Sequence, residues 1–323
     1  MFDVAIIGLG CAGYTAAVYT ARYKLSTLLV GLEEGGMGNT AAEVGNWPGE
    51  IEIKGPDLME KFKKHALSFG DTVTYKIDRV SFLDYARNDT QMNARNDTGE
   101  ARGFQLTLEG GETYEAKTII IATGSSKRHL GIPGEEEFSG KGVTYCATCD
   151  AFFYRGKDVA VIGGGDSAVE GAAIAAQVAR KVYLVHRRDQ FRAEPYWVDR
   201  VKAKENVTFV LGHQTVEVLG TSKVTGIKLD TPFQGSDTLT VDGVFIEIGS
   251  DPEVRLPLQL GCALDDRGFL KVDNTMQTSV PGVYGAGDVT SASNHFAQFT
   301  TAAGEATVAA NSVFQYVQTL ASS

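Results

Sequence analysis

The stretch FDVAIIGLGCAG, residues 2–13, opens the chain with a short apolar run that ends in the spacing Gly-x-Gly-x-x-Gly. Residues 14–23 then have the composition of a helix, and residues 27–30 form a second apolar run. Glycine-rich turns are common, but strand, glycine turn, helix and strand in this order make the βαβ unit of dinucleotide-binding folds, whose helix N-terminus faces a pyrophosphate. The stretch therefore predicts nucleotide binding, with candidate contacts at Gly8, Gly10, Cys11, Ala12 and Gly13.

An acidic residue is expected about 20 residues after the last glycine of such a unit, where it accepts hydrogen bonds from ribose hydroxyls. Counting from Gly13 reaches Glu33, with Glu34 beside it. This favours a ribose without a 2′-phosphate, as in FAD or NAD, although solvated loop carboxylates would give the same pattern. Further candidates for lining this cofactor lie in a glycine-dense stretch and near the C-terminal end of the chain: Gly36, Asn46, Gly287 and Asp288.

A second strand, glycine loop and helix follow at residues 158–179, with the spacing Gly-x-Gly-x-x-Ala. Here the same count from Ala168 reaches Arg188 instead of an acid. Guanidinium groups in this place suit a 2′-phosphate through charge-assisted, bidentate hydrogen bonds, whereas the alternative is a solvated basic turn. The pattern predicts an NADPH site made of Gly163, Gly165, Asp166, Ser167, Ala168, His186, Arg187, Arg188 and Arg192.

Between the two nucleotide motifs lies Cys146-Ala147-Thr148-Cys149-Asp150. Two thiols separated by two residues can close and reopen a small disulfide, which suits reversible two-electron chemistry. Alone, the pair is equally compatible with half of a zinc site or with a structural bridge. No second cysteine pair is present to complete a zinc site, and the position between nucleotide motifs favours redox chemistry without a metal.

Composition sets the broad class. The chain has 323 residues, 43% of them apolar and 22% charged, as in a soluble globular protein of about two domains. Its net charge of −10 argues against a nucleic-acid or anionic-membrane partner. No apolar run is long enough to span a bilayer, no secretory signal is visible, and four cysteines suit a reducing compartment. We therefore expect a cytoplasmic protein without a membrane segment.

Strand-type alternation marks residues 74–83 and 103–108. Between them the sequence Ala-Arg-Asn-Asp-Thr at residues 86–90 recurs at residues 94–98. This polar segment has no apolar face. It is predicted to form the solvated tip of a long hairpin.

In this order, over nearly the whole chain, the motifs resemble the low-molecular-weight thioredoxin reductases, the class II NADPH/FAD pyridine nucleotide-disulfide oxidoreductases. The resemblance also rests on Glu43-Val44-Gly45-Asn46-Trp47-Pro48-Gly49 and on Gly285-Ala286-Gly287-Asp288-Val289. It implies an α/β protein with two Rossmann-like, three-layer ββα dinucleotide-binding domains, the second inserted into the first. Residues 1–128 and 250–323 would form the FAD domain, and residues 129–249 the NADPH domain that carries the cysteines.

The resemblance further implies a homodimer whose inserted domain rotates during turnover. NADPH would reduce FAD, and the flavin would reduce the Cys146–Cys149 disulfide with Cys149 on the flavin side. Cys146 would then attack the disulfide of thioredoxin or a thioredoxin-like small protein. Asp150 would act as the acid and base for the thiols.

Three departures from the family pattern stand out: Met37 where a glutamine is usual, Ala297 where an arginine is usual, and Ser250 where a histidine is usual. They predict an altered flavin potential or domain motion with NADPH use retained. The family run that contains Ala297 lies against the flavin, so the resemblance implies that Gln298 contacts FAD. Two alternatives remain at this stage. One is the same scaffold fed by another donor such as ferredoxin, or acting as a dithiol oxidase. The other is a non-enzymatic flavin redox sensor.

Overall fold

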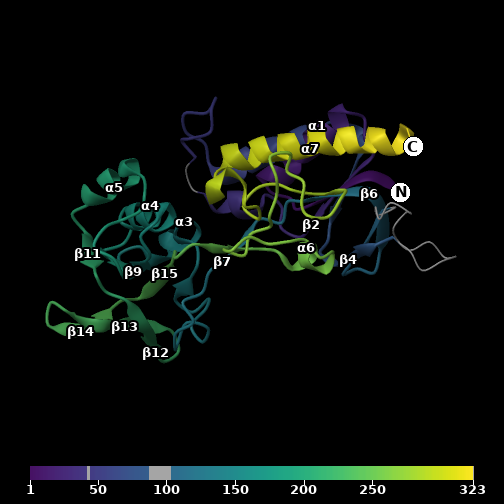
Figure 1. Cartoon of the computed structure of the whole chain (residues 1–323). Coiled ribbons are helices and arrows are strands. Elements are labelled where there is room, and N and C mark those ends of the chain that lie inside the picture. The colour runs from purple at the N-terminus through teal and green to yellow at the C-terminus, as the bar shows by residue number, and fades with distance from the viewer. Residues whose placement is uncertain (42–43, 87–102, 323) are drawn as a thin grey trace. The chain divides into compact units, whose positions relative to one another are not determined.

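The computed structural model describes residues 1–41, 44–86 and 103–322, which divide into two compact units (Figure 1). Unit 1 comprises Met1–Ser126 and Pro252–Ser323, and unit 2 comprises Lys127–Asp251, so unit 2 is an insertion in unit 1. The predicted hairpin tip over the duplicated segment lies outside the described residues, as does Glu43.

Unit 1 is built on a seven-stranded sheet in the order β3-β2-β1-β6-β5-β4, with β17 paired to β6. Pairing is parallel along β3, β2, β1, β6 and β17, and antiparallel among β4, β5 and β6. The strands are β1 (Phe2–Ile7), β2 (Thr27–Gly31), β3 (Val73–Ile77), β4 (Val80–Tyr85), β5 (Phe104–Leu108), β6 (Thr113–Ile121) and β17 (Val283–Gly285).

Helices cover one face of this sheet: α1 (Cys11–Arg22), α2 (Gly55–Leu67) and the long α7 (Phe299–Ser322). Val4 and Ile6 of β1 point into that helical layer, whereas Ala5 and Ile7 pack in a second cluster on the other face, with α6 (Arg255–Gln259). Successive strand residues point to opposite faces. Burial on both faces therefore explains why β1 is a continuous apolar run.

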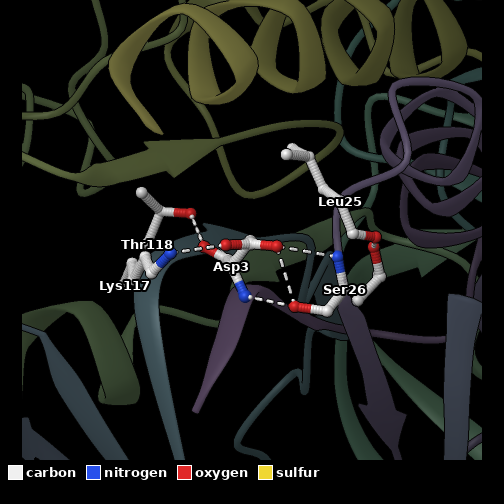
Figure 2. A network of polar contacts seen from close by, with 6 residues as sticks. Asp3, Leu25, Ser26, Lys117 and Thr118 are labelled. Atoms are coloured by element: carbon white, nitrogen blue, oxygen red, sulfur yellow. Dashed lines mark hydrogen bonds and ion pairs between the residues drawn. The ribbon is translucent and has the colours of Figure 1, made fainter. Parts of the chain in front are cut away.

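A network around Asp3 joins β1 to its two neighbouring strands (Figure 2). The Asp3 carboxylate accepts hydrogen bonds from Ser26 N at 2.9 Å and Ser26 Oγ at 2.8 Å, and it pairs with Lys117 Nζ at 2.7 Å. Thr118 Oγ1 donates to the Asp3 carbonyl at 2.7 Å. Burial opposes ionisation of Asp3, but the contacts with Lys117 and Ser26 outweigh it and lower the pKa of the carboxyl. The network joins the N-terminal end of β1 to the strands on both sides of it.

Unit 2 has three layers. Its central sheet is parallel, in the order β11-β10-β9-β15-β8, and a three-stranded antiparallel sheet, β12-β13-β14, packs on one face. Helices α3, α4 and α5 pack on the other face. The elements are β8 (Val143–Thr144), α3 (Ala147–Asp150), β9 (Asp158–Ile162), α4 (Asp166–Ala175), β10 (Lys181–His186), α5 (Pro195–Lys202), β11 (Val207–Leu211), β12 (Thr215–Gly220), β13 (Val224–Phe233), β14 (Ser236–Thr240) and β15 (Gly243–Ile246).

The remaining elements are short. β7 (Ser125–Lys127) and β16 (Ser250–Pro252) pair as a two-stranded sheet where the chain passes between the units. Four 3₁₀ turns, η1 (Gly36–Thr40), η2 (Gly70–Thr72), η3 (Ala151–Tyr154) and η4 (Ala292–His295), complete the described structure. Within the described residues, no helix has the length and apolarity needed to cross a bilayer.

The strand pattern at residues 74–83 is divided in the structure. β3 ends at Ile77 and β4 begins at Val80, because β3 pairs with β2 whereas β4 pairs with β5. Asp78 makes the turn between them, since its carboxylate accepts hydrogen bonds from Arg79 N at 2.7 Å and Gly110 N at 3.0 Å. Side-chain alternation alone does not show such a change of partner strand.

Candidate dinucleotide sites and the cysteine pair

The first glycine loop connects the carboxyl end of β1 to the N-terminus of α1. Gly8 has φ +131°, and a Cβ there would lie 2.0 Å from the Ala122 carbonyl oxygen. A Cβ at Gly13 would lie 1.8 Å from the Gly8 carbonyl oxygen, so both glycines are required by packing. At Gly10 the nearest atom would be 3.9 Å away. Protein packing therefore does not require a glycine at position 10. A phosphate that approaches the backbone at the helix N-terminus does require one, because a Cβ would obstruct it.

The turn after β17 lies against the same helix N-terminus. A Cβ at Gly287 would meet the Ala12 Cβ at 3.0 Å, and the Asp288 charge acts on Cys11. Burial, with a contribution from the charge of Glu305, raises the pKa of Asp288 to about 6. Among the described residues, no side chain or backbone group makes a hydrogen bond to the Asp288 carboxylate. This carboxylate can therefore accept a hydrogen bond from a ligand hydroxyl.

Other predicted contacts of this cofactor gather at the start of α7. Asn46 Nδ2 donates to Gln298 Oε1 at 2.9 Å, and Cys11 Sγ contacts the Phe299 carbonyl oxygen at 3.4 Å. Burial raises the pKa of Cys11 to about 12, so this thiol stays protonated. Gly36 begins η1, and a Cβ there would lie 3.5 Å from Gly10 Cα, so this segment lies beside the first glycine loop.

The two adjacent acids after β2 differ in their surroundings. Glu33 is exposed, whereas Glu34 binds Lys63 and Tyr75 through one carboxylate oxygen. These contacts lower the pKa of Glu34, with the Lys63 hydrogen bond as the largest cause. Because Glu34 is already engaged, Glu33 is the acid available to a ribose.

The second glycine loop follows β9 and, like the first, combines a glycine that packing requires with one that is open. Gly163 has φ +146°, and its Cβ would lie 2.1 Å from the Glu247 carbonyl oxygen and 2.7 Å from the Ala168 Cβ. At Gly165 no atom would lie within 4 Å. Gly165 is therefore free for close approach by a phosphate at the N-terminus of α4.

The basic loop after β10 is tied to this glycine loop. Arg192 N donates to the Gly164 carbonyl at 2.7 Å, and Glu194 N donates to Asp166 Oδ1 at 2.6 Å. His186 is buried beneath Gly164, and burial together with the nearby arginines lowers its pKa. The side chains of three exposed residues pair with no group in the described part of the chain: Arg187, Arg188 and Arg192. Three unpaired guanidinium groups beside an open glycine loop fit a phosphorylated ribose.

The cysteine pair lies at the carboxyl end of β8, in the same unit as the basic loop. Cys146 and Cys149 form a disulfide with their Cα atoms 5.3 Å apart, and Cys149 N donates to Cys146 Sγ at 3.2 Å. Cys149 is exposed. Asp150 is the last residue of α3, and its carboxylate accepts a hydrogen bond from Thr144 Oγ1. The predicted dithiol motif therefore carries a carboxylate fixed next to it.

Sequence reasoning missed two buried acids that support these sites. Glu305 Oε2 accepts hydrogen bonds from Gly287 N at 2.8 Å and Thr290 Oγ1 at 2.9 Å, so it holds the turn that carries Asp288. Glu247 Oε1 accepts from Ala147 N at 3.0 Å, between the two cysteines. Glu247 could have been singled out from the sequence because it directly follows an apolar strand, and ligands of α/β sheets bind at the carboxyl ends of strands.

Residues 2–306 match the family model described as pyridine nucleotide-disulphide oxidoreductase. The chain belongs to this family. It is 41% identical to the thioredoxin reductase of Listeria monocytogenes over 99% of this chain and 95% of that protein. It is also 42% identical to the glucosaminate ammonia-lyase of Pseudomonas fluorescens, over 98% and 96% of the two chains. The thioredoxin reductase structure of Lactococcus lactis matches with a TM-score of 0.88 and 35% identity, covering 99% of this chain and 100% of that one.

These comparisons confirm three predictions from the sequence. The family resemblance holds over nearly the whole chain, and the α/β fold with two dinucleotide-binding domains is that of solved thioredoxin reductases. FAD and NADPH are the cofactors that the family membership and the two open glycine loops support.

Proposed function

We propose that the chain is an NADPH-dependent thioredoxin-disulfide reductase. The observation that carries this proposal is the Cys146–Cys149 disulfide, which lies in the unit where a loop of unpaired arginines adjoins an open glycine loop. The other unit has an acidic residue, Glu33, at the corresponding place. One chain thus has a place for a bare ribose, a place for a 2′-phosphate and a disulfide to receive electrons.

Each unit takes one cofactor in this proposal. Unit 1 corresponds to the FAD domain, predicted over residues 1–128 and 250–323. It binds the dinucleotide with Gly8, Gly10, Cys11, Ala12, Gly13, Glu33, Gly36, Asn46, Gly287, Asp288 and Gln298. Unit 2 corresponds to the NADPH domain, predicted over residues 129–249. It uses Gly163, Gly165, Asp166, Ser167, Ala168, His186, Arg187, Arg188 and Arg192.

When bound, FAD supplies two-electron transfer between the nicotinamide and a disulfide. The chain's own residues orient the partners and move protons. Arginine side chains fix the phosphorylated ribose, and Asp288 accepts a hydrogen bond from a hydroxyl of the flavin cofactor. Asp150, held by Thr144, exchanges a proton with the thiols formed when the disulfide opens. Cys149 takes the flavin side, and Cys146 attacks the disulfide of the protein substrate.

The protein substrate in this proposal is thioredoxin or a small protein like it. Directly after the cysteine motif, Phe152 is 60% exposed and Phe153 is 76% exposed. Exposed adjacent aromatic rings beside a reactive disulfide are typical of a protein-docking surface. We further propose that the active form is a cytoplasmic homodimer, as in the family that the sequence resembles.

The alternatives explain less of the structure. An enzyme supplied with electrons by ferredoxin, or a dithiol oxidase, has no need for Arg187, Arg188 and Arg192 beside an open glycine loop. A non-enzymatic sensor does not explain two dinucleotide loops. An ammonia-lyase, the activity named for one relative, does not require the Cys146–Cys149 disulfide.

Turnover tests this proposal. The protein is expected to oxidise NADPH in the presence of oxidised thioredoxin, and a Cys149→Ser variant that retains FAD is expected to show no such turnover. Wild-type protein loaded with FAD that oxidises no NADPH with any thioredoxin would refute the proposal. A Cys262→Ser variant is a matched control, because Cys262 is a buried thiol outside the motif.

A further inference from the structure

Glu247 occupies an unusual position in unit 2. It follows β15, at the carboxyl edge of the central sheet, and its side chain is 5% exposed. Its backbone lies against the second glycine loop: its N–H donates to the Ile162 carbonyl at 2.8 Å, and its carbonyl oxygen is 2.1 Å from the position of a Cβ at Gly163. The backbone of Glu247 is therefore fixed against the glycine loop independently of its side-chain contacts.

The two carboxylate oxygens of Glu247 reach two other functional segments. Oε1 accepts the Ala147 N–H at 3.0 Å, and that amide follows Cys146 directly. Oε2 pairs with Lys127 Nζ at 2.9 Å. Lys127 is the first residue of unit 2, in the strand where the chain enters from unit 1. The Glu247 carboxylate thus contacts two segments. One is residues 146–150, which carry the cysteine pair and are called the redox loop below, and the other is β7, the strand by which the chain enters unit 2.

Packing and hydrogen bonds with Thr144 also hold the redox loop. Ala147 is fully buried, and its Cβ lies 2.7 Å from the position of a Cβ at Gly171, so α3 sits directly on α4. Burial raises the pKa of Glu247, while Lys127 and the Ala147 amide act in the opposite direction. When both side chains are ionised, the charges of Glu247 and Lys127 cancel. This pair lies next to the Ala147 amide, which directly follows Cys146. Removing either partner leaves a net charge there, of opposite sign in the two cases.

We propose that Glu247 is a positioning residue for the redox loop, and that its pairing with Lys127 sets the reduction potential of the Cys146–Cys149 disulfide. This inference rests on the proposed redox role of the pair. The physical reason is that opening a disulfide produces thiols whose thiolate forms respond to nearby charge. A positive charge left on Lys127 stabilises the reduced form, and a negative charge left on Glu247 destabilises it.

The test is a thiol–disulfide equilibrium of the FAD-loaded protein with glutathione, without NADPH, at about pH 8, near the ordinary thiol pKa. The reaction is balanced: the protein disulfide and two reduced glutathione molecules give the protein dithiol and one oxidised glutathione. Protein thiols are trapped with a maleimide and counted by mass. Cys11 and Cys262 are buried and present in every variant.

Relative to wild type, Glu247→Gln is expected to shift the equilibrium constant toward the dithiol by at least about threefold, which is ~14 mV for a two-electron couple. Lys127→Met is expected to shift it toward the disulfide by a similar factor. The double variant keeps an acceptor for Ala147 N and has neither charge, so its equilibrium constant is expected within about twofold of wild type. Glu205→Gln, an exposed site in the same unit, is the matched control for loss of a carboxylate and is expected to behave as wild type.

Two results would overturn the inference: single variants that shift the equilibrium in the same direction, as general loosening of the loop would, or no shift beyond that of Glu205→Gln. If Glu247→Gln does not fold, the expected shift toward the disulfide in Lys127→Met still decides the matter. Because the measurement uses neither NADPH nor thioredoxin, it separates this inference from the proposed function. A wild-type protein that equilibrates with glutathione but does not turn over NADPH would count against only the latter.

Discussion

Asn46 Nδ2 donates a hydrogen bond of 2.9 Å to Gln298 Oε1, joining a glycine-rich loop to the start of α7 across 252 positions of sequence. Both residues were predicted contacts of the same cofactor. Loop residues 45–51 line a shallow depression that is open to solvent. The bond therefore has a role that local sequence does not reveal, which is to fix the loop on the helix.

The first prediction concerns this bond. An Asn46→Ala variant is expected to release FAD about fivefold faster than wild type, because a net hydrogen bond contributes about 1 kcal/mol. FAD fluorescence after dilution measures the release. Asn311→Ala is the control, since Asn311 accepts a hydrogen bond from Tyr23, which directly follows α1, away from the loop. Equal release rates for wild type and Asn46→Ala would contradict the proposed role of the bond.

The second prediction uses the two open glycines as controls for each other. Gly10→Ala is expected to weaken FAD binding by at least about tenfold while leaving NADP⁺ binding unchanged, because the added Cβ meets no protein atom but obstructs a phosphate. Gly165→Ala is expected to do the reverse. Isothermal titration of each ligand measures both affinities. Two variants that lose the same ligand would show that the loops are not separate sites.

The third prediction tests the 2′-phosphate contact. Arg188→Ala is expected to lower kcat/KM for NADPH by about 10- to 100-fold, since hydrogen bonds to charged groups contribute about 1.5–3 kcal/mol. The value for NADH is expected to stay within about twofold, because NADH has no 2′-phosphate. Lys202→Ala, another exposed cation of unit 2, is the control. An equal loss for both nucleotides would mean that Arg188 does not contact the distinguishing phosphate.

The fourth prediction concerns pH. Burial and Glu305 raise the pKa of Asp288 to about 6, so below this pH the carboxyl is protonated in the protein without cofactor. A ligand hydroxyl that donates to the ionised form lowers this pKa, so FAD binding releases a proton. FAD affinity is therefore expected to increase by up to roughly tenfold from pH 5 to pH 7 and to level off above. Titrations across this range check it, with Asp288→Asn expected to give a flat profile. A wild-type affinity that is independent of pH would contradict the role of Asp288.

The loops that form the candidate sites could be predicted because they are local in sequence. The glycine spacing and the count of about 20 residues identified both loops, and Glu33 and Arg188 lie at the positions so reached. These rules work because the βαβ unit is a single continuous segment with fixed strand and helix lengths.

The supporting residues could not be predicted in this way. Glu247 is 100 residues from Ala147, and Glu305 acts on a turn 18 residues earlier. Each reaches its partner only because parallel strands or a packed helix bring distant segments together. The division of residues 74–83 into β3 and β4 has the same origin, since the partner strands decide where each ends.

The most direct test of the proposed electron path is an anaerobic titration of the FAD-loaded protein with NADPH, followed by flavin absorbance and by counting protein thiols. Wild type is predicted to consume about two equivalents of NADPH per FAD, one for the flavin and one for the Cys146–Cys149 disulfide. A Cys149→Ser variant is predicted to consume about one equivalent, and NADH is predicted to be a poor substitute. Failure of NADPH to bleach the wild-type flavin, or reduction of the flavin without the appearance of thiols, would contradict it.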